Sequence, residues 1–532
     1  MIRKKSNLLY IFFLYLIIIL LFTKIDYRFV EEIPCCQDDH DYYSHAETIA
    51  IDFDLDYSNQ FKGFEEERYF KNNIIAPIGF IGSGLLASPF LFVGSLFEKN
   101  LNSDSVIFNY KILFYSISAV FYFFLSIHLI NISFKYLKIK TNLNYLFLLF
   151  MGSGVAYFAF ERYSMTHVYE VFTTSLIIYV VIRFYTLESN RNYFAFLIPL
   201  VTLLSICVRW VNYHVLFIPL IIKILFRNRL IEKNTLLNNY LFYFSYLFFT
   251  GLLLILNKAI YGIYTINPTT VYGNSNKLSS FLEMDLLTIF ETIFISMFKI
   301  LFSNEFGIFW FSPILFAGLI FLIYFVFVPK KENFFKYILL LLFYGIPFSM
   351  VILWQSTASS YGFRYLYSLI PIAILIYKKW SLEADNSIPK QYLLYFSFFA
   401  SLSIIFFETS PQTSLSQNIN TFGIDDRFSQ PNYLAGYLKS FFNIDAYLKI
   451  FTTSFLGVIF FKLVFAFFSS DTVNMLLAKL NLPVENTDYL TFVDNLKSVS
   501  SQQILIFLLL ILLIVGWFIL LIKRDNMKKL IS

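Results

Sequence analysis

Long apolar runs recur along most of the chain. An α-helix needs roughly 17–25 mainly apolar residues to cross the hydrocarbon core of a bilayer, and twelve runs approach or exceed that length. Hydrophobic residues make up 58% of the chain and charged residues only 14%. This leaves too few polar residues to cover the surface of an ordinary water-soluble protein. The sequence therefore predicts an integral membrane protein. The runs lie near 8–23, 112–130, 145–160, 166–186, 193–208, 210–226, 237–256, 308–328, 335–353, 364–378, 391–407 and 503–522.

These runs are continuous and show no alternation of polar and apolar residues. In lipid every backbone amide needs a partner within the protein, so a spanning segment is either a helix or a strand of a closed barrel. Barrel strands alternate lipid-facing and lumen-facing residues with a period of two, which the runs lack. The fold class that we expect is all-α, a polytopic transmembrane helical bundle.

Basic residues mark one side of the membrane. Cytoplasmic segments carry an excess of Lys and Arg, whereas residues 26–73 hold thirteen acidic residues against four basic ones. We therefore expect this acidic stretch on the non-cytoplasmic side. The first run has no small-residue cleavage site behind it, so we expect it to be retained as a helix. The basic groups on the cytoplasmic side lie at 3–5, 135–140, 227–233, 330–331 and 378–379.

Three further apolar segments would disturb this charge pattern if they crossed the bilayer. We expect 74–97 to lie along the interface or to re-enter, 286–302 to form an interfacial helix and 447–468 to lie on the outer surface. This leaves about twelve spans and places both termini in the cytoplasm. The expected organisation is a transmembrane unit over 1–407 with an outer loop over 24–105, followed by an outer loop and a final span within 408–532.

Carboxylates gather in two groups within the acidic stretch. Like charges at close range raise each other's pKa, so such a cluster is retained where water surrounds it, where it binds a cation or where a base is needed. A solvated loop, a divalent-cation site and a catalytic base therefore all remain open. The residues are Asp39 and Asp41, then Asp52, Asp54 and Asp56, with Asn59 after them.

A second polar group occupies a short turn between two apolar runs. A turn of this length does not need so many ionisable groups, although a lone His167 is also typical of an interfacial, hydrogen-bonded histidine. The turn reads Glu161-Arg162-Tyr163-Ser164-Met165-Thr166-His167, and Glu170 follows one helical turn later.

Two arginines lie at membrane level. Arg209 falls between two apolar runs, and Arg364 precedes Tyr365 in a polar segment that begins at Trp354. A cation is costly inside a bilayer and usually faces a partner or an aqueous cavity. The planar guanidinium suits phosphate because it donates two parallel hydrogen bonds. The alternative for Arg209 is snorkelling to the lipid headgroups.

Five short motifs follow one another along the chain in a recognisable order. The acidic stretch is similar to D-E-x-Y-Y … D-G-D-L-D … N, with His40 and Phe53 in place of the usual Glu and Gly. The turn at 161–167 is similar to E-P-x-M-S-H, with Arg162 in place of Pro. The other motifs are 206–209, an Arg-bearing helix; 304–313, similar to G-L-F-x-x-S-P; and 361–365 with Pro371, similar to F-G-x-R-Y … P.

Together these motifs resemble those of the membrane glycosyltransferases with the C-type fold, which include protein O-mannosyltransferases and aminoarabinose transferases of lipid A. The resemblance covers about residues 8–380. It implies a hexosyl- or pentosyltransferase that takes a sugar from a polyprenyl-phosphate donor. The sugar passes, with inversion, to an acceptor on the non-cytoplasmic side of the cell (inner) membrane. Lipid, glycan and protein acceptors all remain open.

The resemblance also implies roles for individual residues. Asp39 is expected to act as general base toward the acceptor hydroxyl, and Arg364 or Arg209 to neutralise the leaving phosphate. A divalent cation is left open. The expected catalytic group is Asp39, Asp41, Asp54, Glu161 and His167; the donor-phosphate group is Arg209, Arg364 and Tyr365; and the acceptor- or loop-positioning group is Asp52, Asp56, Asn59 and Trp354.

Two other classes of protein remain open. A transporter or flippase of lipid-linked saccharides would use the arginines and outer carboxylates as gates or substrate contacts, with ionisable groups near mid-bilayer on several helices. A non-catalytic scaffold is favoured if Asp39 and Glu161 lie far apart. No nucleic-acid partner is expected, because juxtamembrane Lys and Arg explain the net charge of +6. The sequence has no Gly-rich phosphate loop before a helix, which favours a lipid-linked donor over a nucleotide sugar.

Overall fold

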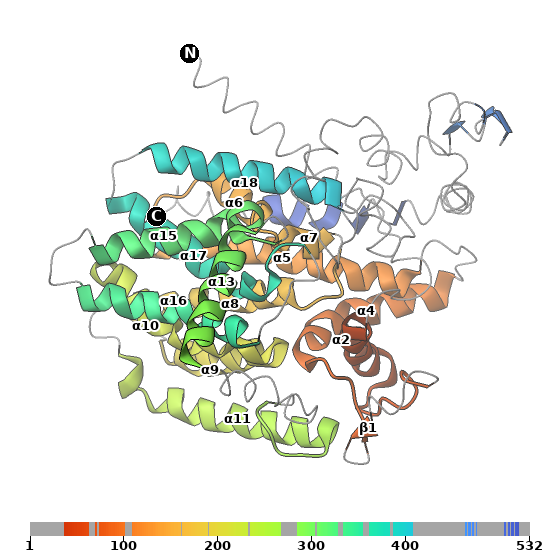
Figure 1. The fold of residues 1–532 in the computed structure, drawn as a ribbon. Coiled ribbons are helices and arrows are strands. Elements are labelled where there is room, and N and C mark those ends of the chain that lie inside the picture. Colours follow the sequence, from red (N-terminus) through yellow and green to blue (C-terminus); the bar gives the residue numbers. More distant parts are fainter. Residues whose placement is uncertain are drawn as a thin grey trace.

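The computed structural model is mostly helical over the residues that it describes (Figure 1). This agrees with the expected helical bundle. The described strands are a single short antiparallel pair, β1 (Phe70–Lys71) and β2 (Ile74–Ile75). The described residues are 37–62, 70–71, 74–101, 109–160, 162–189, 191–231, 235–267, 285–303, 306–327, 334–354, 361–383 and 387–407, with short pieces between 463 and 520.

The helices follow the apolar runs closely. Those that form the bundle are α2 (Gln37–Glu47), α4 (Ile81–Leu101), α5 (Tyr110–Tyr136), α6 (Leu143–Met151), α7 (Val155–Phe160), α8 (His167–Thr186), α9 (Arg191–Val208), α10 (Ile218–Phe226), α11 (Tyr240–Tyr261), α13 (Leu286–Phe302), α14 (Ile308–Phe311), α15 (Pro313–Phe327), α16 (Phe334–Trp354), α17 (Ile370–Glu383) and α18 (Ser387–Phe407). Shorter helical turns are the π-turn η2 (Thr48–Asp52) and the 3₁₀ turns η3 (Trp210–Phe217), η4 (Arg227–Arg229), η5 (Leu236–Asn238) and η8 (Arg364–Leu369).

Six helical segments of the described chain are long and apolar enough to cross a membrane. By the length and apolar composition of these helices, the chain is a membrane protein. The number of twelve spans and the placement of the termini stay predictions. The run at 8–23 lies outside the described residues, and only parts of 503–522 are described. The six segments are α4, α5, α8, α9, Trp210–Arg229 and α11.

The segment 74–97, expected at the interface, contributes most of the continuous 21-residue helix α4. The glycines of this segment do not interrupt the helix. They lie where neighbouring segments pack closely against it. A Cβ added to Gly84 would lie 2.4 Å from the Cβ of His45 in α2, and one added to Gly82 would lie 2.3 Å from the backbone nitrogen of Val208. The composition that suggested a broken segment therefore allows α2 and the end of α9 to approach α4 closely.

Helices α5 and α8 form the centre of the bundle. In each, 83% of the most apolar window is buried, compared with 17% in α11. α5 packs against α4 and α8, and α8 packs against α9. α11 lies along one edge of the molecule, where large apolar side chains such as Leu247 and Phe248 are exposed (Figure 1). Such a face is suited to contact with lipid tails.

The run 145–160 was expected to form one helix, but the structure divides it into α6 and α7. The break lies at Gly152–Ser153–Gly154, and Gly154 has a positive φ of 84°. A Cβ at Gly154 would lie 2.1 Å from the hydroxyl oxygen of Tyr367. Both the backbone conformation and the lack of space require glycine here, which apolar periodicity alone does not reveal.

Substitution of Gly154 by Ala tests whether the break between α6 and α7 requires glycine at this position. We expect a loss of about 1–3 kcal/mol of stability, because the new Cβ meets both left-handed backbone strain and Tyr367. The measurement is the thermal unfolding temperature in detergent. Gly251→Ala in α11 is the matched control, since its added Cβ would meet nothing within 4 Å. Equal unfolding temperatures for the two variants would contradict the assignment.

Candidate functional site

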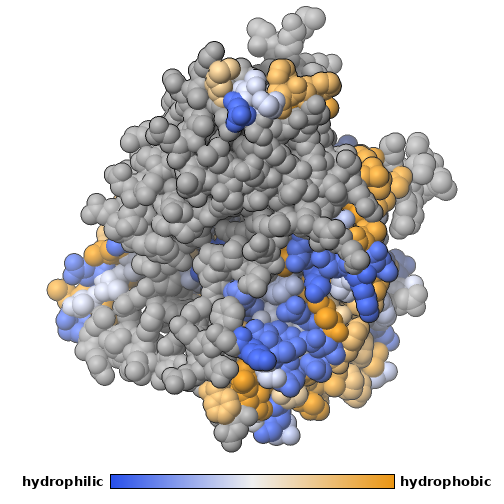
Figure 2. All heavy atoms as spheres, turned by 90° about the vertical axis from the view of Figure 1, so that its right-hand side faces the viewer, coloured by the Kyte–Doolittle hydropathy of each residue, from blue (hydrophilic) through white to orange (hydrophobic). Residues whose placement is uncertain are grey.

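Helix α2 brings the acidic stretch onto the bundle. The stretch from Gln37 to Glu47 was expected as part of an outer loop, yet it is helical and packs against α4. Asp38 and Asp39 occupy its first turn, where carboxylates are favoured by the helix dipole. Asp39 and Asp41 are buried, whereas Asp38 is exposed. Figure 2 views this end of the molecule, where the described side chains form a largely hydrophilic area bordered by hydrophobic ones.

Asp39 forms an ion pair and a hydrogen bond with the turn that precedes α8. Its Oδ2 accepts a hydrogen bond from Nη2 of Arg162 at 2.8 Å, and both side chains are at most 3% exposed. Its Oδ1 accepts a short hydrogen bond from the Ser164 hydroxyl. Both carboxylate oxygens are thus engaged. A carboxylate that is paired with a guanidinium and hydrogen-bonded in its charged form is a weak base.

A second set of hydrogen bonds fixes the other end of α2. Oδ2 of Asp41 accepts from the backbone N–H of Gly79 at 3.1 Å, and the carbonyl of Gly79 accepts from Nε2 of His45 at 3.0 Å and from the Tyr261 hydroxyl at 2.9 Å. Nδ1 of His45 then accepts from the hydroxyl of Tyr57 at 2.7 Å. Burial lowers the pKa of His45 to about 4, so the ring is neutral near pH 7.

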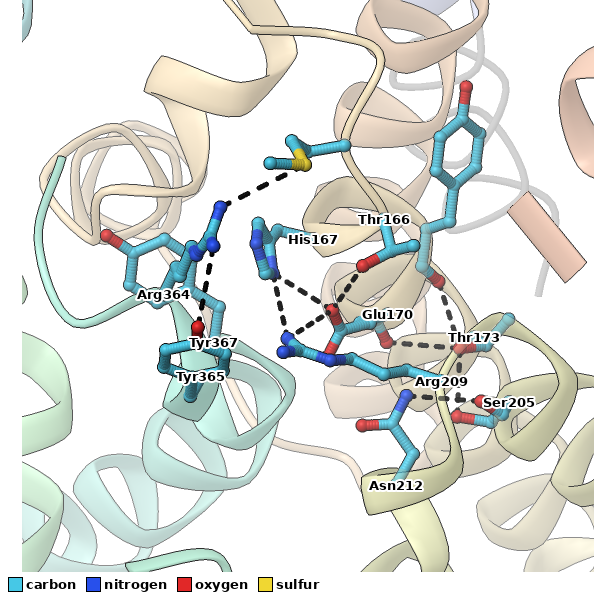
Figure 3. A network of polar contacts seen from close by, with 12 residues as sticks. Thr166, His167, Glu170, Thr173, Ser205, Arg209, Asn212, Arg364, Tyr365 and Tyr367 are labelled. Carbon is cyan, nitrogen blue, oxygen red and sulfur yellow. Dashed lines mark hydrogen bonds and ion pairs between the residues drawn. The ribbon is translucent and has the colours of Figure 1, made fainter. Parts of the chain in front are cut away.

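Glu170 lies in the first turn of α8, and one of its carboxylate oxygens is in contact with three polar side chains (Figure 3). Its Oε1 lies 2.9 Å from Nδ1 of His167, 2.8 Å from the Thr166 hydroxyl and 3.3 Å from Nη1 of Arg209. Glu170 and His167 are buried. Arg209 occupies the extended junction between α9 and η3, so its guanidinium leaves the helix end and reaches α8.

Arg364, at the start of η8, is a buried cation with weak partners. It is 7% exposed, and its closest polar contacts are the sulfur of Met165 at 4.0 Å and the hydroxyl of Tyr365 at 3.4 Å. Within the described part of the chain, no carboxylate lies within ion-pair distance of it. A buried charge without close compensation is costly, so this geometry favours an anionic ligand.

The two guanidiniums share one aromatic ring. The Cζ atoms of Arg209 and Arg364 lie 4.7 Å and 5.2 Å from the ring centroid of Tyr365. Among the described residues, Glu170 is the carboxylate in ion-pair contact with this pair. The charge of Asp38 also acts on Arg364. Among the described residues, the two guanidiniums therefore outnumber the carboxylates in ion-pair contact with them, as expected of a site for a phosphate or another anion.

Tyr42 connects α2 to these arginines. It lies four residues after Asp38, on the same face of the helix. Burial raises the pKa of Tyr42, and the charges of Asp38 and Arg209 also act on it. Its ring lies against Gly79, where an added Cβ would come within 2.7 Å. Tyr42 is therefore a protonated phenol on α2 that lies within the electrostatic influence of Asp38 and Arg209.

The alternating acidic residues form a separate, mostly exposed segment. Asp54 and Asp56 are exposed and accept hydrogen bonds from backbone groups two residues further on. Oδ2 of Asp52 accepts from the side chains of Asn59 and Gln60 at 3.0 and 2.5 Å. These local contacts give the segment a turn-stabilising role. The catalytic role expected for Asp54 and the positioning roles expected for Asp52, Asp56 and Asn59 stay predictions.

Other expected site residues fall outside what can be described. Glu161 is not among the described residues, and the side chain of Trp354 is likewise outside them. No group of three or more His, Cys, Asp or Glu side chains that could hold a metal ion occurs in the described part of the chain. The divalent cation that the sequence left open stays untested.

The structure adds five residues that were not among the expected site residues: Asp38, Tyr42, Arg162, Ser164 and Glu170. The signal for Asp38 and Tyr42 was their spacing of four residues, which places them on one face only once the segment is known to be helical. Arg162 and Ser164 belong to the polar turn that was recognised, but their partner Asp39 is 123 and 125 residues away in sequence. Such pairings are set by tertiary packing.

Comparison with known proteins returns no relative. No family model, no curated protein and no solved structure matches this chain.

Lowering the pH is expected to loosen the α2 end of the bundle through His45. The folded pKa of about 4 lies below the ordinary value of 6.5, so the unfolded chain binds the proton first. Stability from this group is complete above pH 6.5 and is lost as the pH falls toward 4. His45→Gln should be less stable at pH 7 but should show a shallower fall between pH 7 and 4.5. Parallel pH profiles of the unfolding temperature would contradict this account.

The Asp39–Arg162 pair is expected to behave as a buried ion pair. Asp39→Asn should cost about 3–5 kcal/mol, because it removes the negative charge that pairs with the buried guanidinium of Arg162. Arg162→Gln should cost a similar amount. The double variant should be more stable than the sum of the two losses predicts, and unfolding of all four proteins in one detergent measures this coupling. Strict additivity would show that the pair does not interact in solution.

Proposed function

We propose that this protein is a glycosyltransferase that takes a sugar from a polyprenyl-phosphate donor and transfers it, with inversion, to an acceptor hydroxyl. The observation that carries the proposal is the pair of guanidiniums on the ring of Tyr365, from Arg209, which is partly buried, and Arg364, which is buried. Glu170 is the described carboxylate within ion-pair distance of either. A dianionic or monoanionic phosphate would supply the missing negative charge.

Arg364 and Arg209 would bind the phosphate of the donor. As the bond between the anomeric carbon and the phosphate oxygen breaks, charge grows on that oxygen. Fixed guanidiniums in a water-poor site stabilise such charge strongly. Tyr365 would hold the two cations at a fixed spacing. The contact of Glu170 and His167 with Arg209 would keep its guanidinium oriented in the absence of donor.

A carboxylate of α2 would act as the general base. The base takes the proton from the acceptor hydroxyl while the hydroxyl oxygen attacks the anomeric carbon on the face opposite the phosphate. Asp39 was the expected base, but both of its oxygens are engaged by Arg162 and Ser164. We assign this role to Asp38, whose carboxylate is exposed in the first turn of α2 and whose charge acts on Arg364. Asp39 would then position α2, and Asp41 would hold Gly79.

The distribution of charge along the helices supports an enzyme over a transporter. Asp38 lies in the first turn of α2, Glu170 in the first turn of α8, Arg209 just after α9 and Arg364 at the start of η8. All four are at helix ends. A transporter is expected to carry ionisable groups near the middle of several spans.

Sugar transfer in proteoliposomes tests the proposal directly. With a panel of polyprenyl-phosphate sugars as donors, Asp38→Asn is expected to lower the transfer rate by about 10²–10⁴-fold. Arg364→Gln is expected to lower it by about 10²–10³-fold. The matched control is Glu188→Gln, which changes an exposed carboxylate just beyond the far end of α8.

The stability of each variant separates the two candidate bases. Asp38→Asn should unfold at the wild-type temperature, since Asp38 is exposed, whereas Asp39→Asn should unfold earlier. A fully active Asp38→Asn beside an inactive, equally stable Asp39→Asn would return the role of base to Asp39. If the wild-type protein transfers no sugar from any donor of the panel, the proposed function is wrong.

A further inference from the structure

A basic pocket lies at the end of the bundle away from Asp39. It has a volume of about 290 Å³ and opens between α5, α6, α17 and α18. Its polar lining comprises Lys140, Lys378 and Lys390 together with Thr141, Asn142, Tyr145, Tyr377 and Ser381. None of the site residues discussed above contributes to it.

Helix α5 extends from the neighbourhood of α2 to this pocket, so its length gives the distance between the pocket and the candidate site. Tyr115, near the start of α5, makes an edge contact with Tyr43 of α2 at 5.2 Å. Phe134, near the other end of α5, lines the pocket. The nineteen residue-to-residue steps from Tyr115 to Phe134 span about 28 Å along a helix, close to the roughly 30 Å thickness of a hydrocarbon core. If one site lies at one membrane surface, the other lies near the opposite surface.

The pocket concentrates positive charge. None of the residues that line it is acidic. Glu383, the described carboxylate on α17, is paired with Lys379 at 2.5 Å, and Lys379 does not line the pocket. Nζ of Lys390 lies 4.9 Å from the ring centroid of Tyr145. Three ammonium groups around one cavity repel one another unless an anion lies between them.

Two further features suit an anionic group on a lipid. Helix α6 begins at Leu143 beside the pocket, so the positive end of its dipole adds to the lysines. The inner wall is apolar, formed by Phe134, Leu149 and Ile374. Basic pockets between membrane helices with such walls can bind the phosphate of an anionic headgroup while an acyl chain contacts the apolar part.

We propose that the pocket between α5, α6, α17 and α18 binds a phosphate group, held by Lys140, Lys378 and Lys390. Its apolar wall favours a phosphate carried by a lipid over free inorganic phosphate. This binding site is independent of the proposed sugar transfer, because it lies at the other end of the bundle.

The test measures ligand-dependent stabilisation of the full-length protein in a neutral detergent. Phosphatidylglycerol, phosphatidylcholine and inorganic phosphate are titrated separately against the wild type, the double variant Lys378→Gln/Lys390→Gln and the control Lys379→Gln. We expect phosphatidylglycerol to raise the unfolding temperature of the wild type and of the control. Removal of each lysine is expected to weaken binding about fivefold, so the double variant should bind more than tenfold more weakly.

The arms of the experiment identify the source of the phosphate. Stabilisation by phosphatidylglycerol that the double variant loses supports a lipid site, and the same pattern with inorganic phosphate supports a site for the free ion. Equal stabilisation by phosphatidylcholine, equal response of the double variant, or no response to either phosphate ligand would overturn the proposal. Native mass spectrometry of the three proteins counts bound lipid and separates lost binding from lost stability.

Discussion

The buried ion pair between Asp39 and Arg162 connects parts of the chain that are 123 residues apart and sets the geometry of the whole candidate site. It joins the first turn of α2 to the turn that begins α8. Because Met165 and His167 belong to that same turn, its position also fixes where Arg364 and Arg209 find their contacts. Without this pair, α2 would keep its hydrogen bonds to Gly79 but lose the ion pair that joins it to the turn before α8.

The scaffold beneath this site is simple in physical terms. α5 and α8 are buried along most of their length and present two opposite ends to the surroundings. Polar groups gather at those ends because a charged side chain can be compensated there by water, headgroups or the unpaired backbone groups of helix termini. One end combines acids with guanidiniums, and the other collects lysines around an apolar-walled cavity. The two ends thus differ in chemistry while sharing the same helices.

Sequence reasoning predicted the helical class well, since a lipid-facing chain needs long apolar runs and satisfied amides. It did not predict the division into α6 and α7, because the break lies at a left-handed Gly154 that packs against Tyr367, a residue far along the chain. It selected Asp39, His167, Arg209 and Arg364, and each has a partner from the polar turn before α8 or from Glu170 or Tyr365. Asp38 was missed because a segment treated as a loop has no helical phase, and exposure follows from that phase.

The ring of Tyr365 is shared by two guanidiniums that come from different parts of the chain. An anion that draws Arg364 away from this ring also changes the surroundings of Arg209, and through Arg209 the contacts of Glu170 and His167. A ligand bound at Arg364 is therefore expected to affect a histidine at the beginning of α8, because both arginines lie on the same ring.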